Sequence, residues 1–409
     1  MPLKILSLID FFDPAFMGGA GRVFYELNLA LEDKGHHLNV ICRRAPERSE
    51  ISTENNINFH TYPEIPGGQF KKLGYYKRSI KKLFLQYIKK ETPDFIIVHS
   101  SSACLGLAEI FKSINVPIVY YFHSPWHREY EIIAGKKRSL FKHLMVSTLS
   151  AVRQYHENRY INIASSVITL SQSMQNILLE THKDIKKIPL LINPGAADLK
   201  KYFPPENQTN KLEIRRKLNI DEHAFTVITS RRLVARTGVD LLINAFGDVI
   251  RAFHNQTTQK NLKLILTGTG ASENELKQLA VDLKISEHII FTGHVEERLL
   301  PEYYRAGDLF VMPTKELEGF GLSTVEAMAT ALPVIGTNIG GTPEILSKIS
   351  DQLIIQECTS AAIAEKIIHF IKEENLQEWS KKSLKCCREY FTWEKHTDRL
   401  LDFLQKETI

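Results

Sequence analysis

Short apolar runs rich in isoleucine and valine alternate with longer helical patterns through the whole chain. The runs are "KILSLI", "LNVIC", "FIIVHS", "PIVYYFHS", "SVITLS", "FTVITS", "LKLILTG", "HIIFTG", "DLFVMP" and "LPVIGTN". Such nearly continuous hydrophobicity predicts strands that are buried on both faces, as in parallel sheets covered by helices. The helical patterns between them supply the crossovers that parallel strands need, at 20–34, 139–160, 238–254, 273–284 and 296–305. The sequence therefore predicts an α/β fold of doubly wound, Rossmann-like sheets.

The length of 409 residues exceeds what one hydrophobic core usually holds, so two domains are expected. A boundary fits the stretch "LINPGAADLKKYFPPENQT", where proline, glycine and asparagine cluster before a helix expected at about residue 211. This assigns one domain to 1–195 and a second to 196–391, with a tail that is helical in pattern from about residue 360. Ligands of such proteins bind beyond the carboxyl ends of the strands, so we expect the chemistry in a cleft that both domains face.

The composition is that of an ordinary globular protein. No apolar run approaches the length that crosses a bilayer, and the amino-terminal "MPLKILSLID" becomes acidic at Asp10 before a signal-peptide pattern forms. Five cysteines without C-x-x-C spacing argue against a disulfide framework and against a zinc site. We therefore expect a cytoplasmic protein.

Positive charge is concentrated in the first half of the chain. Residues 1–195 contain 25 Lys and Arg against 17 Asp and Glu, and eight of the basic residues lie in "QFKKLGYYKRSIKKLFLQYIKK", residues 69–90. A basic amphipathic helix of this kind suits an anionic membrane, which would place the protein at the inner face of the membrane. The alternative is a solvated helix that packs on its own domain. Nucleic acid is a poor candidate partner, because no recognised reading module accompanies the charge.

The stretch "EGFGLSTVE" places two carboxylates, Glu318 and Glu326, around a loop of mostly small residues. Glycine lets backbone N–H groups approach a ligand, and Ser323 and Thr324 are suitable N-cap residues for a helix over "STVEAMATA". A loop at a helix N-terminus can hold an anion, and Glu326 then falls in the first helical turn. The alternative interpretation is that Glu326 only complements its own helix dipole and that Glu318 is a solvated loop charge.

Three further loops follow predicted strands. "DFFDPAFMGGAGRV" brings Gly18 and Gly19 before a helix, where a phosphate or sugar hydroxyl can approach, although its spacing and the lack of an acidic ribose partner argue against a nicotinamide site. His123 follows the run "PIVYYF" and precedes the stiffening residues Pro125 and Trp126, a location that favours a functional histidine. The loop "RRLVARTGVD" contains three arginines, which predict a dianion such as a diphosphate: Arg231, Arg232 and Arg236.

Phosphate clamps together with carboxylates that accept hydrogen bonds from hydroxyls are what a nucleotide sugar requires. The chain carries, in order, "GGAGR", "FHSPW", "SRRLVARTGVDLLINAF", "LILTGTG", "IIFTGHV", "LPEYYRAGDLFVMPT", "EGFGLSTVEAMATALPVIGTNIGGTPEIL" and "FTWEKHTDRLL". These motifs resemble the retaining glycosyltransferases of family four, which have the GT-B fold. The resemblance runs over nearly the whole chain and is strongest from about 225 to 346.

The resemblance implies transfer of a hexose-type sugar from a nucleoside-diphosphate sugar to an acceptor hydroxyl, with retention of anomeric configuration. The acceptor would be a glycan, a lipid-linked molecule or a small molecule. The last helix, at about 392–409, would pack back on the first domain. Domain closure is also implied, because both domains would contact the donor.

Single residues take roles from the same resemblance. Glu318 would lie near the hydroxyls and anomeric centre of the donor sugar, and Glu326 would hold the ribose hydroxyls. Arg232 would be the main cation for the diphosphate. The backbone amides that would hold the diphosphate belong to Phe320, Gly321 and Leu322.

The resemblance also implies contacts from four other loops. Gly268 and Val295 would line the nucleotide base. Gly18 and Gly19 would approach the donor phosphate or sugar, and His123 would lie beside the sugar. Glu318 and His123 are therefore the residues expected to act in catalysis.

One departure from the family pattern concerns positive charge. The family reads glycine-arginine-leucine and then lysine-glycine, whereas here Arg231 stands at the glycine and Thr237 at the lysine. We expect Arg236 to compensate as a donor ligand, since losing a charge-assisted hydrogen bond costs about 1.5–3 kcal/mol. No D-x-D metal motif lies in a suitable loop, so we expect no cofactor, no metal, and activity in the presence of a chelator.

Three other functions fit parts of the sequence. A nucleotide-sugar epimerase of the same fold would convert the sugar nucleotide without an acceptor. A non-catalytic nucleotide-sugar-binding subunit gains support from the missing lysine, and it would bind donor without hydrolysing it. A Rossmann oxidoreductase rests on glycine loops alone.

Overall fold

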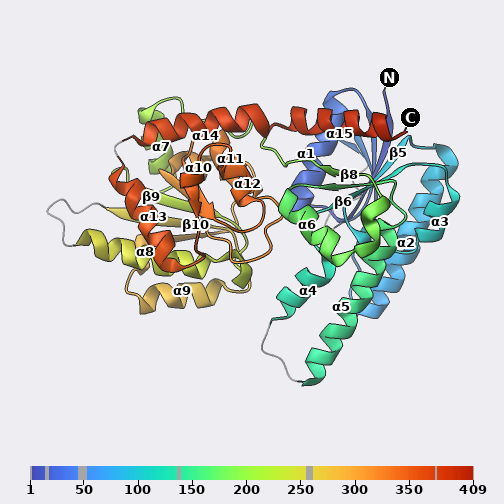
Figure 1. Cartoon of the computed structure of the whole chain (residues 1–409), viewed down its shortest axis with the longest axis horizontal. Coiled ribbons are helices and arrows are strands. Elements are labelled where there is room, and N and C mark those ends of the chain that lie inside the picture. Colours follow the sequence, from blue (N-terminus) through green and yellow to red (C-terminus); the bar gives the residue numbers. More distant parts are fainter. Residues whose placement is uncertain are drawn as a thin grey trace. The chain divides into compact units, whose positions relative to one another are not determined.

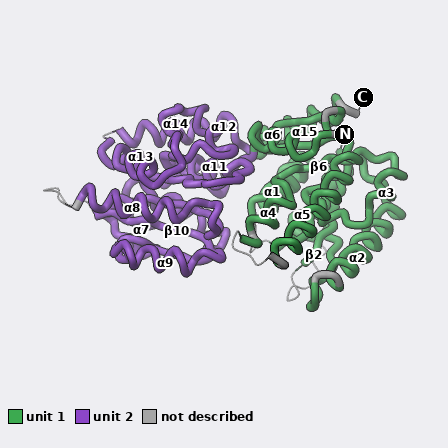
Figure 2. Tube along the Cα trace, turned by 60° about the horizontal axis from the view of Figure 1, so that its bottom comes forward, with its two compact units in different colours: residues 1–194, 393–409 green, residues 195–392 purple. Residues whose placement is uncertain are grey.

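The computed structural model describes residues 2–13, 18–44, 53–135, 140–254, 261–373 and 375–408. The chain divides into two compact units, and Figure 2 distinguishes them. Unit 1 comprises 1–194 together with 393–409, and unit 2 comprises 195–392. The chain therefore leaves unit 1 after Pro194 and returns to it at Trp393.

Unit 1 is built on a sheet whose strands run in the order β3-β4-β2-β1-β5-β6-β7-β8. The pairs are parallel, apart from the antiparallel edge pair of β3 with β4. The strands are β1 (Lys4–Phe11), β2 (His37–Arg44), β3 (Thr53–Glu54), β4 (Ile57–Pro63), β5 (Phe95–Val98), β6 (Ile118–Phe122), β7 (Ser166–Thr169) and β8 (Leu190–Ile192). Every residue of β5, β6 and β7 is buried, as the continuous apolar runs predict.

The helices of unit 1 are α1 (Gly19–Asp33), α2 (Gln69–Lys90), α3 (Ala108–Ser113), α4 (Trp126–Ala134), α5 (Leu140–Ile161), α6 (Gln172–Thr181) and α15 (Trp393–Thr408), with short 3₁₀ turns η1 (Ser101–Cys104) and η2 (Lys183–Lys187). The helix α15 is the last of the chain and packs against α1, the first (Figure 1). The basic segment 69–90 forms a single helix, α2, as its pattern predicts. Among the described residues, we find no helix with the length and hydrophobicity needed to span a bilayer.

Unit 2 has a fully parallel sheet in the order β11-β10-β9-β12-β13-β14. Its strands are β9 (Phe225–Ser230), β10 (Leu262–Thr267), β11 (Ile289–Gly293), β12 (Leu309–Met312), β13 (Val334–Thr337) and β14 (Ile354–Ile355). Numbered along the chain this is the doubly wound order 3-2-1-4-5-6, in which the winding reverses between the first and fourth strands. That switch point lies between β9 and β12.

The helices of unit 2 are α7 (Gln208–Lys217), α8 (Val239–His254), α9 (Glu273–Asp282), α10 (Leu300–Ala306), α11 (Leu322–Ala329), α12 (Thr342–Leu346), α13 (Ser360–Lys372) and α14 (Leu376–Tyr390), with 3₁₀ turns η3 (Ala235–Thr237), η4 (Ser286–His288) and η5 (Asp351–Leu353). In Figure 1, α8 and α9 lie on one face of the sheet, and α10, α11 and α12 lie on the other. The sheet is therefore covered on both sides, which explains why its strands read as apolar runs.

The ten apolar runs all form strands, so the prediction of doubly wound α/β sheets is confirmed. Two helix starts differ from the prediction. The helix α10 begins at Leu300 and not at 296, because Pro301 is suited to the first helical turn and the preceding residues form a turn. Trp126, expected in the loop after His123, is instead the first residue of α4, directly after the N-cap residue Pro125.

Candidate active site

The loops after β9 and β12 meet at the switch point of unit 2. The two strands are adjacent and parallel, so their carboxyl ends lie at the same edge of the sheet. Arg231 is the first residue after β9, and Thr314 is the second after β12. Ligands of doubly wound sheets bind at this edge, and five of the predicted site residues lie in these two loops: Arg232, Arg236, Glu318, Phe320 and Gly321.

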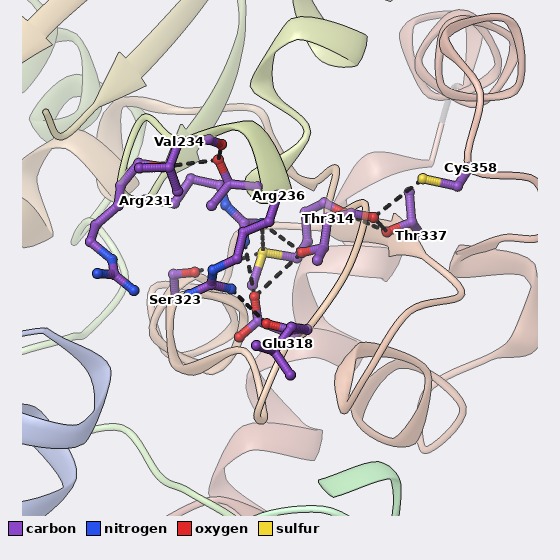
Figure 3. Close-up of polar contacts among 12 residues, drawn as sticks. Arg231, Val234, Arg236, Thr314, Glu318, Ser323, Thr337 and Cys358 are labelled. Carbon is purple, nitrogen blue, oxygen red and sulfur yellow. Dashed lines mark hydrogen bonds and ion pairs between the residues drawn. The ribbon is translucent and has the colours of Figure 1, made fainter. Parts of the chain in front are cut away.

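The side chain of Arg231 joins the two loops (Figure 3). Its Nη2 donates to Oε2 of Glu318 at 2.9 Å, and its Nη1 donates to Oγ1 of Thr314 at 2.8 Å and contacts Sδ of Met312 at 2.7 Å. The Arg231 side chain is 6% exposed and that of Glu318 is 16% exposed. Burial lowers the pKa of Arg231, and the Glu318 carboxylate opposes that shift. The guanidinium of Arg231 therefore pairs with Glu318, whereas the sequence alone grouped Arg231 with Arg232 and Arg236 as arginines for a dianion.

The backbone around Glu318 is held from several sides. Leu317 adopts a positive φ of 54°, which is uncommon for a residue with a side chain, and its carbonyl accepts a hydrogen bond from Nη1 of Arg236 at 2.6 Å. The carbonyl of Glu318 accepts from the backbone N–H of Gly341 at 3.2 Å. A Cβ at Gly340 would lie only 2.2 Å from the same carbonyl oxygen, so this close approach requires glycine.

The helix α11 follows this loop. Its first residue differs from the one that the sequence predicts. Its N-cap is Gly321, with a φ of 102°, and its first residue is Leu322, so Ser323 and Thr324 lie inside the helix. Glu326 is consequently in the second turn and not in the first. The first turn contains no acidic residue, and Gly321 has no side chain to cap the leading N–H groups. The first turn of α11 therefore contains no carboxylate that could neutralise the positive end of the helix dipole.

Two threonine hydroxyls add to the polarity around Gly321. Oγ1 of Thr324 and Oγ1 of Thr342 are buried without a hydrogen-bond partner among the described residues. A Cβ at Gly321 would lie 3.4 Å from the first and 3.6 Å from the second. The side chain of Phe320 points into the core, where its ring packs edge-on against that of Phe391 at 5.8 Å. The loop thus offers backbone and small polar groups at the position where an anion was predicted.

Glu326 is a buried carboxylate. The residue is only 3% exposed, and its Oε2 accepts a hydrogen bond from the hydroxyl of Tyr304 at 2.9 Å. Tyr304 comes from α10 and is itself fully buried. A buried carboxylate with a fixed partner contradicts the alternative that Glu326 only complements its own helix dipole in solvent.

The remaining predicted residues of unit 2 occupy neighbouring loops. Arg232 is exposed, whereas Thr237 is buried and donates from Oγ1 to the carbonyls of Arg232 and Val234. Gly268 follows β10 with a φ of 116°, and a Cβ there would lie 2.2 Å from the carbonyl oxygen of Arg231. Val295 is half-buried in the connection from β11 to α10. Gly268 is therefore required for the packing of the arginine loop, whatever else it contacts.

In unit 1 the glycines Gly18 and Gly19 lie at the start of α1. Gly18 is the N-cap, without a side-chain cap, and the first turn of α1 has no acidic residue. A Cβ on either glycine would meet no described atom within 4 Å. Packing among the described residues therefore does not require glycine at either position.

His123 follows β6, as predicted, and is paired with a second histidine that sequence reasoning did not find. Its Nε2 lies 3.2 Å from Nδ1 of His99, the first residue after β5, and the two rings stack at 5.4 Å. Burial lowers the pKa of His123 to about 4 and holds the pKa of His99 well below 6.5. Both rings are therefore neutral at physiological pH, and one nitrogen of the contact donates to the other.

A third histidine approaches the same group from the C-terminal helix. The Tyr121 hydroxyl lies 3.2 Å from Nε2 of His396, and the Tyr121 ring stacks on that of His99 at 4.9 Å. Nδ1 of His396 faces the carbonyl of Pro194 at 2.8 Å. Because that carbonyl can only accept, Nδ1 carries the hydrogen and Nε2 accepts from Tyr121. Burial lowers the pKa of His396 to about 4, in keeping with this neutral form.

Comparison with protein-family models matches both units. The model described as Glycosyltransferase Family 4 matches residues 17–196, and the model described as Glycosyl transferases group 1 matches residues 210–385. Among curated relatives, the alpha-monoglucosyldiacylglycerol synthase of Streptococcus pneumoniae is 25% identical, over 86% of this chain and 74% of the relative. The mannosylfructose-phosphate synthase of Agrobacterium fabrum is also 25% identical, over 95% of this chain and 87% of the relative.

Solved structures share the fold. The sucrose-phosphate synthase of Thermosynechococcus elongatus superposes with a TM-score of 0.79 at 18% identity and covers 98% of both chains. The Anabaena protein HepE, in complex with UDP and glucose, gives a TM-score of 0.72 at 19% identity, over 98% of this chain and 99% of the other. Both units thus have counterparts in the fold of these two solved structures. The chain belongs to the family 4 glycosyltransferases and has their GT-B fold.

Proposed function

We propose that this glycosyltransferase moves a sugar from a nucleoside-diphosphate sugar to an acceptor hydroxyl, with retention of anomeric configuration and without a divalent metal. The observation that carries the proposal is the switch-point edge of unit 2. There, arginine side chains and the uncapped start of α11 lie in the same pair of loops as the carboxylate of Glu318. Positive groups for a diphosphate and an oxygen acceptor for sugar hydroxyls are thereby combined.

The diphosphate is held by unit 2. The N–H groups of Phe320, Gly321 and Leu322 lie at the start of α11. This helix has no side-chain cap and no acidic residue in its first turn. Arg232 is exposed and supplies the main cation, and Arg236 supports it from η3. HepE, which shares the fold, has been solved in complex with UDP-glucose, and this supports a nucleoside-diphosphate donor.

The nucleoside is held by three further residues. Glu326 accepts hydrogen bonds from the ribose hydroxyls, with Tyr304 fixing the orientation of its carboxylate. Gly268 and Val295 line the base from the loops after β10 and β11. A carboxylate is suited to a pair of neighbouring hydroxyls, because each of its oxygens can accept.

The transferred sugar meets Glu318 of unit 2, and the family resemblance assigns His123, Gly18 and Gly19 of unit 1 to the donor as well. Over the whole reaction the bond between the anomeric carbon and the diphosphate oxygen breaks, the acceptor oxygen bonds to the same carbon, and the acceptor's proton and the diphosphate are released. The diphosphate leaves with additional negative charge. Arg232, Arg236 and the start of α11 stabilise that charge. Glu318 stabilises the positive charge that develops at the anomeric carbon or acts as the nucleophile, and the neutral His123 donates a hydrogen bond to the sugar.

A ligand panel tests this function. Thermal unfolding is measured with UDP-, GDP-, ADP- and dTDP-sugars, and one donor class should stabilise the chain by about 2.7 kcal/mol at a hundredfold excess over Kd. With that donor, NMR of the product should show the anomeric configuration of the donor, at a rate unchanged by EDTA. Glu318→Ala should depress kcat, whereas Glu326→Ala should mainly weaken donor binding.

Several results of the panel would count against the proposal. No stabilisation by any sugar nucleotide would remove the donor site, and an inverted product or complete loss of activity in EDTA would remove the mechanism. Conversion of the sugar nucleotide in the absence of acceptor would instead indicate an epimerase. Wild-type kinetics in both glutamate variants would show that the site has been assigned to the wrong residues.

We also propose a lipid-linked acceptor and peripheral contact with an anionic membrane at the cytoplasmic face. The relative from Streptococcus pneumoniae is named for a diacylglycerol glycolipid, and another relative, from Mycobacterium tuberculosis, for a phosphatidylinositol mannoside. In this chain, α2 exposes a row of basic side chains with no acidic residue among them. The helix α5 of the same unit exposes apolar side chains, including Leu144 at 66% and Tyr155 at 63%. Basic and apolar groups together favour binding at an anionic lipid surface.

A further inference from the structure

Arg231 occupies an unusual position for an arginine. Its guanidinium is almost fully buried, and its polar contacts are to Thr314, Met312 and Glu318. A buried charge is costly unless it is paired, so the ion pair with Glu318 is a requirement of this packing. Exposed pairs of the same unit contrast with it, as in Arg216 with Glu222, where the arginine side chain is 60% exposed. Such exposed pairs stabilise proteins little.

The contacts of Arg231 divide the two oxygens of the Glu318 carboxylate. Oε2 accepts from Nη2 of Arg231 at 2.9 Å and from Oγ1 of Thr314 at 3.3 Å. No residue in the described part of the chain hydrogen-bonds Oε1. One oxygen is thus fixed by the protein, and the other remains available to accept a hydrogen bond.

Hydrogen bonds already hold the backbone around Glu318, so only the torsion angles of its side chain remain to be fixed. Arg236 holds the carbonyl of Leu317, and the N–H of Gly341 holds that of Glu318. Arg231 and Thr314 act on the side chain, one from the end of β9 and the other from the end of β12. The rigid sheet at the switch point therefore sets the direction of the carboxylate, and this is how a site held to sub-ångström tolerance is built.

We infer that Arg231 is a positioning residue for Glu318: it anchors Oε2 so that Oε1 is presented to the donor sugar. The inference rests on the proposed function, because it assigns Arg231 a part in sugar transfer through Glu318. It also separates Arg231 from Arg232 and Arg236, which act on the diphosphate. Loss of Arg231 should therefore reduce turnover and leave the affinity for the diphosphate unchanged.

A double-mutant cycle tests this assignment. The variants are Arg231→Met, Glu318→Gln and the double variant, assayed for transfer or, without acceptor, for slow donor hydrolysis. Arg231→Met should lower kcat about 100-fold, the typical effect of a misplaced reacting group. The double variant should be no slower than Glu318→Gln alone, because Arg231 acts only through that carboxylate. Losses that multiply in the double variant would overturn the inference, as would wild-type kcat in Arg231→Met.

Chemical rescue of kcat distinguishes a positioning role from a purely structural one, because a purely structural role predicts no rescue. Arg231→Ala leaves a buried space of guanidinium size beside Glu318, so guanidinium chloride below its denaturing range should raise kcat, whereas equal sodium chloride should not. Arg231→Lys keeps the charge without the forked geometry and should fall between wild type and Arg231→Met. The absence of rescue, together with Arg231→Lys as slow as Arg231→Met, would contradict the positioning role.

Controls separate this inference from the proposed function. Arg251→Ala removes an exposed arginine of the same unit that pairs with Asp248, and it should leave all parameters unchanged. Nucleoside-diphosphate Kd should be equal in wild type and Arg231→Met.

If wild type binds no sugar nucleotide, the proposed function fails. If wild type transfers and Glu318→Gln is slow while Arg231→Met is not, only the role of Arg231 fails. If Arg231→Met does not fold, Thr314→Val, which removes the second contact to Oε2, should still lower kcat.

Discussion

The buried histidines of unit 1 tie the C-terminal helix to the sheet through neutral rings. His396 contacts Tyr121 on one side and the carbonyl of Pro194 on the other, and its backbone carbonyl accepts from Nδ2 of Asn193 at 2.9 Å. Burial dominates the lowered pKa of His396, and the charge of Arg399 lowers it further. Protonation of His396 would place a charge in a site with no anionic partner among these contacts. Folding therefore favours the neutral ring.

This arrangement predicts a pH dependence of stability. The pKa of His396 falls from 6.5 to about 4 on folding, so the unfolded state binds more protons within that window. Stability is full above pH 6.5 and is lost as pH falls toward 4, by about 3 kcal/mol for this one group at about 1.4 kcal/mol per pKa unit. His396→Asn keeps a donor for Pro194 and cannot be protonated. Its unfolding free energy should therefore fall less steeply between pH 6.5 and 4.5 than that of wild type.

Urea unfolding followed by tryptophan fluorescence measures this slope. Trp126 and Trp393 lie in unit 1, so a Trp379→Phe background makes the signal specific for that unit. The exposed His143 on α5 offers a matched control within unit 1, and His143→Asn should keep the wild-type slope. Equal slopes for His396→Asn and wild type would contradict the neutral buried form.

Residues of the candidate site were predictable where a short local motif contains them. The location of His123 after a strand and the loop between Glu318 and Glu326 followed from local patterns. His99, His396 and Tyr304 were not found, because their partners lie far away in the sequence, up to 275 residues for Tyr121 and His396. For Arg231, the sequence did not reveal the buried ion pair with Glu318. Three neighbouring arginines look alike in sequence, and only burial separates the one that pairs with a carboxylate.

Elements were predictable in proportion to their length and burial. The long apolar runs gave the central strands of both sheets, whereas β3, β8 and β14 have two or three residues and carry too little periodicity to be recognised. The strand β4 has seven residues but is only partly buried, and its sequence contains no continuous apolar run. The start of α11 was misplaced because Ser323 and Thr324 are good N-cap types, yet Gly321 caps the helix in a left-handed conformation. That conformation is a matter of backbone geometry, and residue preference at the next positions does not reveal it.

The helix α2 carries the prediction of membrane contact. Its exposed basic side chains are those of Lys71, Lys77, Arg78, Lys81, Lys82, Lys89 and Lys90. Its buried side chains, Ile80, Phe84 and Tyr87, face the unit, so the basic face is turned to solvent. The helix α5 belongs to the same unit and exposes several apolar side chains. Leu144 and Tyr155 on α5 would therefore add apolar contact to the electrostatic attraction.

Vesicle co-sedimentation tests this contact. Lys81→Ala combined with Lys82→Ala should weaken binding to anionic vesicles about 30-fold, at about 1 kcal/mol for each charge near the surface. Lys381→Ala combined with Lys382→Ala makes the same charge change on α14 of unit 2 and should have no effect. Binding should also fall as salt rises, because the attraction is screened. Equal binding to neutral vesicles, or equal binding by both double variants, would contradict a role of α2.

At the scale of the whole molecule, the sequence divides its chemistry between two units. Unit 2 holds Arg232, Arg236, Glu318 and Glu326 at or beside its switch point, and unit 1 holds His123 after a strand of its own sheet. The pattern of strands and helices was sufficient to predict both doubly wound sheets. The identity of base, sugar and acceptor was not predictable, because these depend on the shape of side chains around a ligand and not on periodicity or spacing.

The central claim is that unit 2 binds a nucleoside diphosphate through its arginine loop. Isothermal titration calorimetry of the whole chain with the nucleoside diphosphate of the stabilising donor tests it most directly. Arg232→Ala should weaken Kd about 10- to 150-fold, since a charge-assisted hydrogen bond contributes about 1.5–3 kcal/mol, whereas the exposed control Arg251→Ala should bind as wild type does. Equal Kd values for wild type and Arg232→Ala would contradict the claim.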